Sequence, residues 1–365
     1  MAEGHNWIVD VHTHILPTRL AQKIRGVFLA AEGLSVGQDA NHICCTPAYN
    51  KADEDQGPSF TDQPLFELKY PAYNKDGNMQ KILSENGIRS IWVLPYAHKG
   101  DGMAHQLNGD IVVTCTKGTF ETAFIDAIPA LTVHPDDEKE GVRLTTLEAL
   151  KAGCKAAKLH CSVGHYGILH PSLEPFWEIA NQIRLPVIVH VGNHISGHTA
   201  VSELDDVDKL MQRYKHVIFV IAHSGAPGTS EAIKLATQYS NVYLDTTPVV
   251  SHTIAYPPKS HSQYPDLIRL AKEGKVLFGT DFPNVAVSIE EQIKYIFDTF
   301  ATDESWKQKR KELEAKETAE GLKWWQYKEY AQQAGKAVVE VLGDAALRIF
   351  EQTDQGSLSQ FTSHL

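Results

Sequence analysis

Long apolar runs, of the kind that cross membranes, are missing from this sequence. None of its segments reaches about 18 consecutive apolar residues, the length that a membrane-spanning helix needs. The first residues, MAEGHNWIVDVHTH, also lack the charged and then apolar regions of a secretory signal. We therefore expect a cytoplasmic protein without a membrane partner.

Basic residues are fewer than acidic ones. The 34 lysines and arginines are outnumbered by 45 aspartates and glutamates, which gives a net charge of -11. A nucleic-acid-binding protein needs a basic face for phosphate contacts, so the composition argues against a nucleic-acid partner.

Cysteines are few and show no framework spacing. Their number, 5, is odd, which favours reduced thiols in an intracellular protein over a disulfide scaffold. Hydrophobic residues make up 42% of the chain and charged residues 22%, as in ordinary globular proteins. A chain of 365 residues suits one large α/β barrel or two smaller domains.

What the sequence does contain is a repeating unit of an apolar strand followed by a helix, about 30 residues long. The expected strands are 8–14, 88–94, 125–133, 154–160, 186–190, 217–223, 241–246 and 275–281. Eight such units with apolar rather than alternating strands predict a (β/α)8 TIM barrel. The alternative is a doubly wound open sheet, which would place ligands near one switch point.

Two regions lie outside this rhythm. Residues 31–76 are rich in glycine and proline and form an insertion after the first strand, either a lid over the site or a partly disordered loop. We expect residues 1–300 to form the barrel and 301–365 to form a helical extension packed on it. The pair Trp324-Trp325 would lie either on the barrel or at a subunit contact, so a homo-oligomer is also considered.

Histidines end several of the expected strands. His12 and His14 follow an apolar run and, two residues apart, leave a strand on the same side. His190 and Asp281 end two later strands, and the carboxyl ends of barrel strands meet at one opening. Three imidazoles and one carboxylate suit a catalytic divalent metal ion, with zinc preferred. Such a metal lowers the pKa of its water to about 7 and so supplies a nucleophile.

The set of motifs VDVHTH, NGIRSIWVLPY, AAKLHCS, LPVIVHVG, FVIAHSG, NVYLDTT and VLFGTDFP resembles the amidohydrolase superfamily. The resemblance is to the amidohydrolase-related branch that includes metal-dependent decarboxylases. It implies His12, His14, His190 and Asp281 as metal ligands, and His223 as a catalytic residue that orients water or polarises the substrate. In binuclear relatives a carboxylated lysine bridges two metals, and Lys158 is the matching candidate. One metal per chain is favoured, and two remain open.

Further residues are candidates for smaller roles. His160 ends a strand and could contact substrate or a second metal, or be a hydrogen-bonded wall residue. His134 and His194 are candidates for substrate binding. Asp10 lies on the same strand face as His12 and could hydrogen-bond a ligand imidazole.

Three functions compete. The first is hydrolysis of an ester, lactone or amide in a small polar substrate, with Asp281 as proton shuttle. The second is non-oxidative decarboxylation of a small carboxylic acid, which shares the ligand set. No arginine is placed as a carboxylate clamp, since Arg89, Arg143 and Arg184 precede strands or lie on helices, and this favours the hydrolase. The third is a barrel that binds metal only for structure, which would not need the 31–76 insertion.

Overall fold

The structure is a computed structural model. It describes residues 6–14, 45–46, 67–68, 79–95, 97–116, 125–191, 203–226, 228–247, 264–282, 288–301, 304–314 and 322–352.

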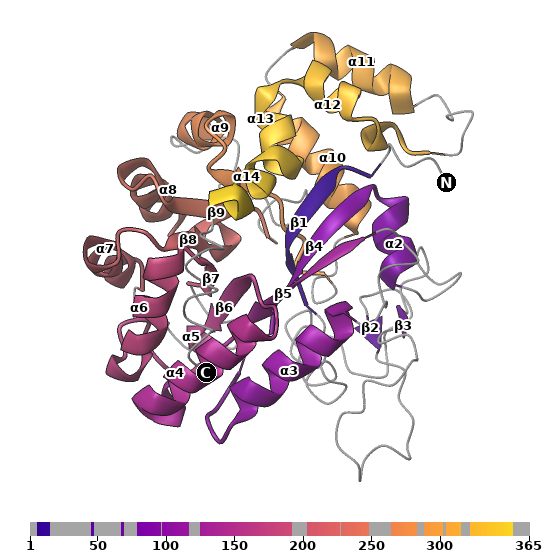
Figure 1. Cartoon of the computed structure of the whole chain (residues 1–365). Helices are drawn as coiled ribbons and strands as arrows, with labels where there is room; N and C mark the ends of the chain where they lie inside the picture. The colour runs from indigo at the N-terminus through magenta and orange to yellow at the C-terminus, as the bar shows by residue number, and fades with distance from the viewer. Residues whose placement is uncertain are drawn as a thin grey trace, which may run out of the picture.

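Eight parallel strands form one sheet that curls into a nearly closed barrel (Figure 1). In spatial order they are β1 (Ile8–Thr13), β4 (Ile88–Val93), β5 (Asp126–Leu131), β6 (Ala156–His160), β7 (Pro186–His190), β8 (Ile218–Ile221), β9 (Val242–Asp245) and β10 (Val276–Leu277). The first and last strands meet where the amide of Val11 donates to the carbonyl of Phe278 at 2.9 Å and that of Asp281 to His12 at 2.8 Å. The sheet confirms the predicted (β/α)8 barrel and excludes the open doubly wound alternative.

Helices follow the strands and cover the outside of the barrel (Figure 1). The principal ones are α2 (Met79–Glu85), α3 (Met103–Thr116), α4 (Glu138–Lys151), α6 (Glu174–Ile183), α7 (Glu203–Arg213), α8 (Thr229–Gln238), α9 (Tyr264–Lys272) and α10 (Ile289–Phe300). Short helices lie between them: η3 (Pro135–Asp137), α5 (Cys161–Gly164), η4 (Pro171–Leu173) and η5 (Ala222–Gly225).

The strands are apolar on both faces because each face has its own core. Ile8, Val187 and Phe219 belong to the layer between the strands and the outer helices. Val9 and Ile188 belong to a second cluster inside the barrel. A strand buried on both faces reads as a continuous apolar run, which is why the sequence signal was clear.

The last helical segment seals the barrel interior at the end opposite the strands' carboxyl ends. It consists of α13 (Lys336–Val339), a π-helical turn η7 (Glu340–Asp344) and α14 (Ala345–Gln352). Ala345, Ala346 and Ile349 pack into the interior cluster with residues of the barrel strands. The π-turn leaves the carbonyl of Val341 available to accept from the amide of Phe278 at 2.9 Å, which ties this segment to the last strand.

Other parts of the C-terminal extension lie beside α10 (Figure 1). They are α11 (Glu304–Glu314), η6 (Trp324–Gln326) and α12 (Lys328–Ala334). Trp324 and Trp325 are buried. The ring of Trp324 packs edge to face on Phe297, with the ring centroids 4.7 Å apart. Of the two locations considered for the tryptophan pair, the structure supports the one on the barrel.

The predicted 31–76 insertion lies mostly outside the described residues. Within it the structure describes β2 (Cys45–Thr46) and β3 (Glu67–Leu68), which pair antiparallel. Its role as a lid stays a prediction. No helix in the described ranges is long and apolar enough to cross a membrane.

Candidate metal-binding active site

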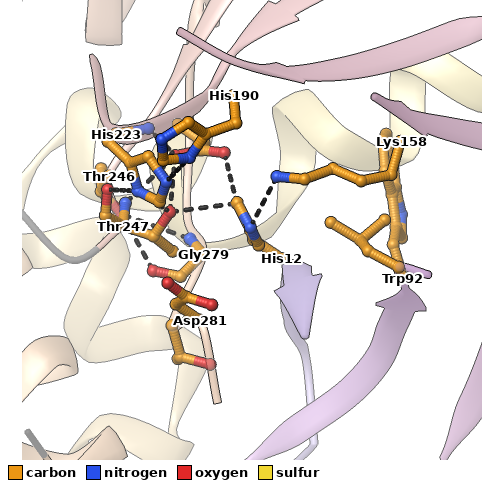
Figure 2. Close-up of polar contacts among 12 residues, drawn as sticks. His12, Trp92, Lys158, His190, His223, Thr246, Thr247, Gly279 and Asp281 are labelled. Atoms are coloured by element: carbon orange, nitrogen blue, oxygen red, sulfur yellow. Dashed lines mark hydrogen bonds and ion pairs between the residues drawn. The ribbon is translucent and has the colours of Figure 1, made fainter. Parts of the chain in front are cut away.

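The predicted site residues come from four strands and meet at the carboxyl ends of the barrel, where Figure 2 shows His12, His190, His223 and Asp281. His12 and His14 stand at the end of β1, His190 at the end of β7, His223 in η5 after β8, and Asp281 after β10. His12, His14, His223 and Asp281 are all buried, and His190 is partly buried.

His12 is held through both ring nitrogens. Its Nδ1 lies 2.8 Å from the carboxylate of Asp245 and 3.0 Å from the hydroxyl of Thr247. A carboxylate accepts, so Nδ1 carries the hydrogen and Nε2 keeps its lone pair. That lone pair faces the amine of Lys158 at 3.1 Å.

His14 also donates a hydrogen bond through Nδ1. Its Nδ1 donates to the carbonyl of Leu94 at 2.7 Å, which leaves the lone pair of the neutral ring on Nε2. This Nε2 lies 3.1 Å from Asp281 Oδ1. A lone pair and a carboxylate repel each other at this distance unless a proton or a metal cation lies between them.

His190 and His223 form a third unit. Nδ1 of His223 donates to the carbonyl of Thr247, so the lone pair of the neutral ring is on Nε2. Nδ1 of His190 lies 2.8 Å from that Nε2 and therefore donates to it. The lone pair of His190 is consequently also on Nε2.

The three histidines predicted as ligands thus share one arrangement, with Nδ1 donating to a protein acceptor and Nε2 unprotonated. A metal-ligating histidine donates its second ring nitrogen to a carboxylate, carbonyl or similar group in this way. Nitrogen and carboxylate donors of this kind fit a divalent transition metal such as zinc. The donor set therefore fits the ion that the sequence predicted.

Distances alone select a slightly different group. Potential ligand atoms of His12, His223 and Asp281 lie within 4.8 Å of one another. Both ring nitrogens of His223 are already engaged, by Thr247 and by His190. Engagement does not by itself exclude a ligand, since Nε2 of His12 also meets the amine of Lys158. We favour His190 because a ligating His223 would have to release another histidine, and we give His223 the role of orienting the His190 ring.

Burial keeps these imidazoles neutral. It is the largest cause that lowers the pKa of His12, His190 and His223 below the usual histidine value. Nearby charges add to the shift, that of Lys158 at His12 and that of His160 at His190. Neutral imidazole is the form that binds metal, so the site is ready for an ion at neutral pH.

Asp281 is ionised although it is buried. Burial alone would raise the pKa of this carboxyl group, but its interaction with His14, 3.1 Å away, brings it below the usual range. A carboxylate that carries full charge at neutral pH can bind a cation or accept a proton.

The backbone is strained at two of the site residues. His223 and Asp281 have φ angles of 56° and 55°, and Ser224 follows His223 with φ 47°. The left-handed region is costly for residues other than glycine, and such outliers gather at functional sites. The amide of His223 donates to Asp245 at 2.7 Å, which helps to hold the turn.

Lys158 lies inside the barrel, one layer below the strand-end histidines. It pairs in register with Ile188, whereas His160 pairs with His190. Burial lowers the pKa of Lys158 to about 8, against the opposing charges of Asp245 and Asp281. The amine of Lys158 lies 3.1 Å from Nε2 of His12.

The structure separates the remaining candidates. The ring of His160 stacks on His190 with centroids 4.0 Å apart, and its Nδ1 accepts from the amide of Val163. His134 is buried, with Nε2 donating to the carbonyl of Gly164 and Nδ1 accepting from the amide of Asp136. Both ring nitrogens of His134 thus bond the backbone, which favours a structural role over the predicted substrate contact. His194 lies outside the described residues.

One expectation about the ligands' surroundings was wrong. Asp10 does not bond a ligand imidazole, because its carboxylate accepts from the main-chain amides of His12 and Thr280, each at 3.0 Å. The imidazole of His12 is held by Asp245 and Thr247, which were not assigned from the sequence. A signal was present, since Asp245 ends a buried apolar strand at the same level as the strand-end histidines.

Comparisons with known proteins agree with the fold. The family model described as Amidohydrolase matches residues 9–312. The uncharacterized TIM-barrel protein Bb4693 from Bordetella bronchiseptica superposes with a TM-score of 0.57 at 16% identity, covering 94% of this chain and 98% of that one.

A second similar structure is the 5-carboxyvanillate decarboxylase LigW2 from Novosphingobium aromaticivorans, with bound manganese. It has a TM-score of 0.52 at 11% identity and covers 96% of this chain and 98% of its own. No curated protein matches the chain. At these identities the two structures support the fold alone, whereas the family model spans most of the sequence: the chain belongs to the amidohydrolase family.

Proposed function

We propose that this protein is a metal-dependent hydrolase that cleaves an ester, lactone or amide bond in a small polar substrate. The observation that carries the proposal is the shared arrangement of His12, His14 and His190, in which each Nδ1 donates to a protein acceptor and leaves a lone pair on Nε2. The ionised Asp281 lies 3.1 Å from Nε2 of His14.

In the proposed site His12, His14, His190 and Asp281 hold one divalent ion, with zinc preferred and manganese as the alternative. When bound, the ion supplies Lewis-acid activation of water or of a substrate oxygen. The remaining chemistry belongs to the side chains. Asp281 accepts a proton from the attacking water and returns it to the leaving group.

His223 orients the imidazole ring of His190. Its Nδ1 is fixed by the carbonyl of Thr247, and its Nε2 accepts from His190 and so keeps the ligand's lone pair on the metal side. Contact of His223 with water or substrate requires that the bond to His190 opens.

Decarboxylation of a small carboxylic acid is the alternative. The similarity to LigW2 supports it, because a decarboxylase shares the whole barrel architecture. An arginine clamp for the substrate carboxylate would support it further. The three arginines considered for that role bind partners on the protein surface instead: Arg89 contacts Asp126, Arg143 contacts Glu140, and Arg184 contacts Gln352. This keeps hydrolysis as the first choice.

Substitution of the shuttle tests the proposal. We expect Asp281→Asn to lower kcat at least about 100-fold, the usual contribution of general acid–base catalysis. The substrates would be a panel of small esters, lactones, amides and aromatic or aliphatic carboxylic acids. Products are read as acid release or as CO2, so each outcome assigns the reaction. Turnover equal to that of the wild type would contradict the role of Asp281.

The variant needs a stability control. We expect the melting temperature of metal-free Asp281→Asn to stay close to that of the wild type, so that loss of turnover reflects chemistry. Predicted cytoplasmic location and self-association are tested separately, by fractionation of cells and by sedimentation of the purified chain.

A further inference from the structure

Asp245 connects two parts of the site that come from different strands. It ends β9, is 0% exposed, and divides its two carboxylate oxygens between separate partners. One oxygen, Oδ2, lies 2.8 Å from Nδ1 of His12. The other, Oδ1, accepts from the amide of His223 at 2.7 Å and from Thr247, at 2.8 Å from the hydroxyl and 3.2 Å from the amide.

We propose that Asp245 is a positioning residue that sets the tautomer of His12 through one oxygen and holds the strained turn of His223 through the other. The inference rests on the proposed metal site, because the tautomer matters for metal binding. Asp245 itself does not touch the ion or the substrate.

The tautomer follows from the division of the oxygens. Three donors converge on Oδ1, so Oδ2 is the oxygen that serves His12. An ionised carboxylate only accepts, and the hydrogen of His12 is therefore held on Nδ1. Lys158 at the opposite nitrogen is consistent with this, since its amine donates to Nε2. Loss of the Asp245 carboxylate removes the charged acceptor at Nδ1, and a proton that moves to Nε2 blocks ligation.

Replacement by asparagine exploits this asymmetry. The amide oxygen would keep the Oδ1 position, because the reversed orientation would point an NH2 group at the amides of His223 and Thr247. The NH2 group would then face Nδ1 of His12 and donate to it. Asp245→Asn should thus switch His12 to the form with hydrogen on Nε2 and leave the turn of His223 in place.

Asp10 provides a matched control. It is a second buried carboxylate beside His12, but it bonds the main-chain amide and not the ring. In Asp10→Asn the oxygen can keep both amide donors, and the NH2 group faces the hydroxyl of Thr280, which can accept. Asp10→Asn therefore replaces a neighbouring buried carboxyl group without changing the surroundings of the His12 imidazole.

The experiment uses the full-length chain labelled with 15N at histidine. Long-range 1H–15N spectra of the metal-free protein report the tautomer of each ring, with His12 assigned by His12→Gln. Titration of Zn²⁺ and, separately, Mn²⁺ gives the dissociation constants. We expect wild type and Asp10→Asn to show Nδ1–H at His12, and Asp245→Asn to show Nε2–H with metal affinity about 10- to 100-fold weaker.

Two results would overturn the inference. One is an unchanged His12 tautomer in Asp245→Asn with an unchanged dissociation constant. The other is an equal loss of metal affinity in Asp245→Asn and Asp10→Asn, which would show a general effect of charge removal. If wild-type protein bound no metal, the proposed function would fail, yet the spectra of the metal-free chain would still decide whether Asp245 sets the tautomer.

Discussion

Lys158 is a fully buried lysine that meets a nitrogen lone pair rather than a partner carboxylate. Its pKa of about 8 lies below 10.5, the ordinary value for a lysine exposed to water. Between these two values the unfolded chain binds more protons than the folded one, so stability rises with pH there. Below pH 8 the cost of burying the charge is present in full.

This cost predicts a pH-dependent effect of Lys158→Met. We expect wild type to gain about 2 kcal/mol of unfolding free energy relative to the variant between pH 7 and pH 10. Urea unfolding of both proteins, free of metal and of dissolved CO2, measures the difference at each pH. A difference that does not change with pH would show that Lys158 does not titrate in this range.

For single residues, the sequence predicted which histidines form the site but not their hydrogen-bond partners or tautomers. Strand-end histidines stand out because an apolar run leads into each of them. Their tautomers depend on acceptors far away in the chain, such as the bond between His12 and Asp245, 233 residues apart. No local pattern contains that information, and the role expected for Asp10 was wrong for the same reason.

Among the elements, α14 has the largest consequence for the barrel. Its sequence is that of an amphipathic helix, and it lies within the segment 301–365 that was expected to be helical. What the pattern could not show is the surface that receives the apolar face. That face fills the barrel interior, where Ile349 is 0% exposed, whereas Leu347 on the same helix is 38% exposed.

Two substitutions in α14 separate these faces. We expect Ile349→Ala to lower the free energy of unfolding by about 2–5 kcal/mol, as for other buried aliphatic truncations. Leu347→Ala should change it by less than about 0.5 kcal/mol. Denaturant unfolding of the two variants beside wild type gives both values. Equal losses would mean that the helix does not seal the interior.

β10 shows a second limit of the sequence at this scale. The expected strand 275–281 is shorter in the structure, with regular pairing at Val276–Leu277. The following residues still bond the first strand, through the carbonyl of Phe278 and the amide of Asp281, but without regular pairing. Asp281 itself adopts a left-handed conformation. A propensity argument cannot foresee a strained residue whose conformation is set by tertiary contacts.

For the whole molecule, the proposed site makes metal a ligand of the folded state. Binding only to the folded chain stabilises it by about 2.7 kcal/mol when the free ion is at 100 times its dissociation constant. We therefore expect Zn²⁺ or Mn²⁺ to raise the melting temperature of chelator-treated protein. The increase should be lost in His190→Ala and largely kept in His223→Ala.

Elemental analysis of protein purified without added metal or chelator completes this test. About one ion per chain would agree with the four proposed ligands. About two would make Lys158 a candidate for a carboxylated bridge. An increase in melting temperature that survives in His190→Ala but is lost in His223→Ala would assign the ligand role to His223 instead.

The position of α14 has a consequence for synthesis on the ribosome. Val9 and Val11 of the first strand share the interior cluster with Ala345, Ala346 and Ile349, which are synthesised only after all eight strands. A nascent chain therefore exposes apolar surface at one end of its barrel until α14 has left the exit tunnel. Such exposed apolar surface attracts chaperones and promotes aggregation. Docking of α14, rather than formation of the eighth strand, is then the step that closes the barrel interior.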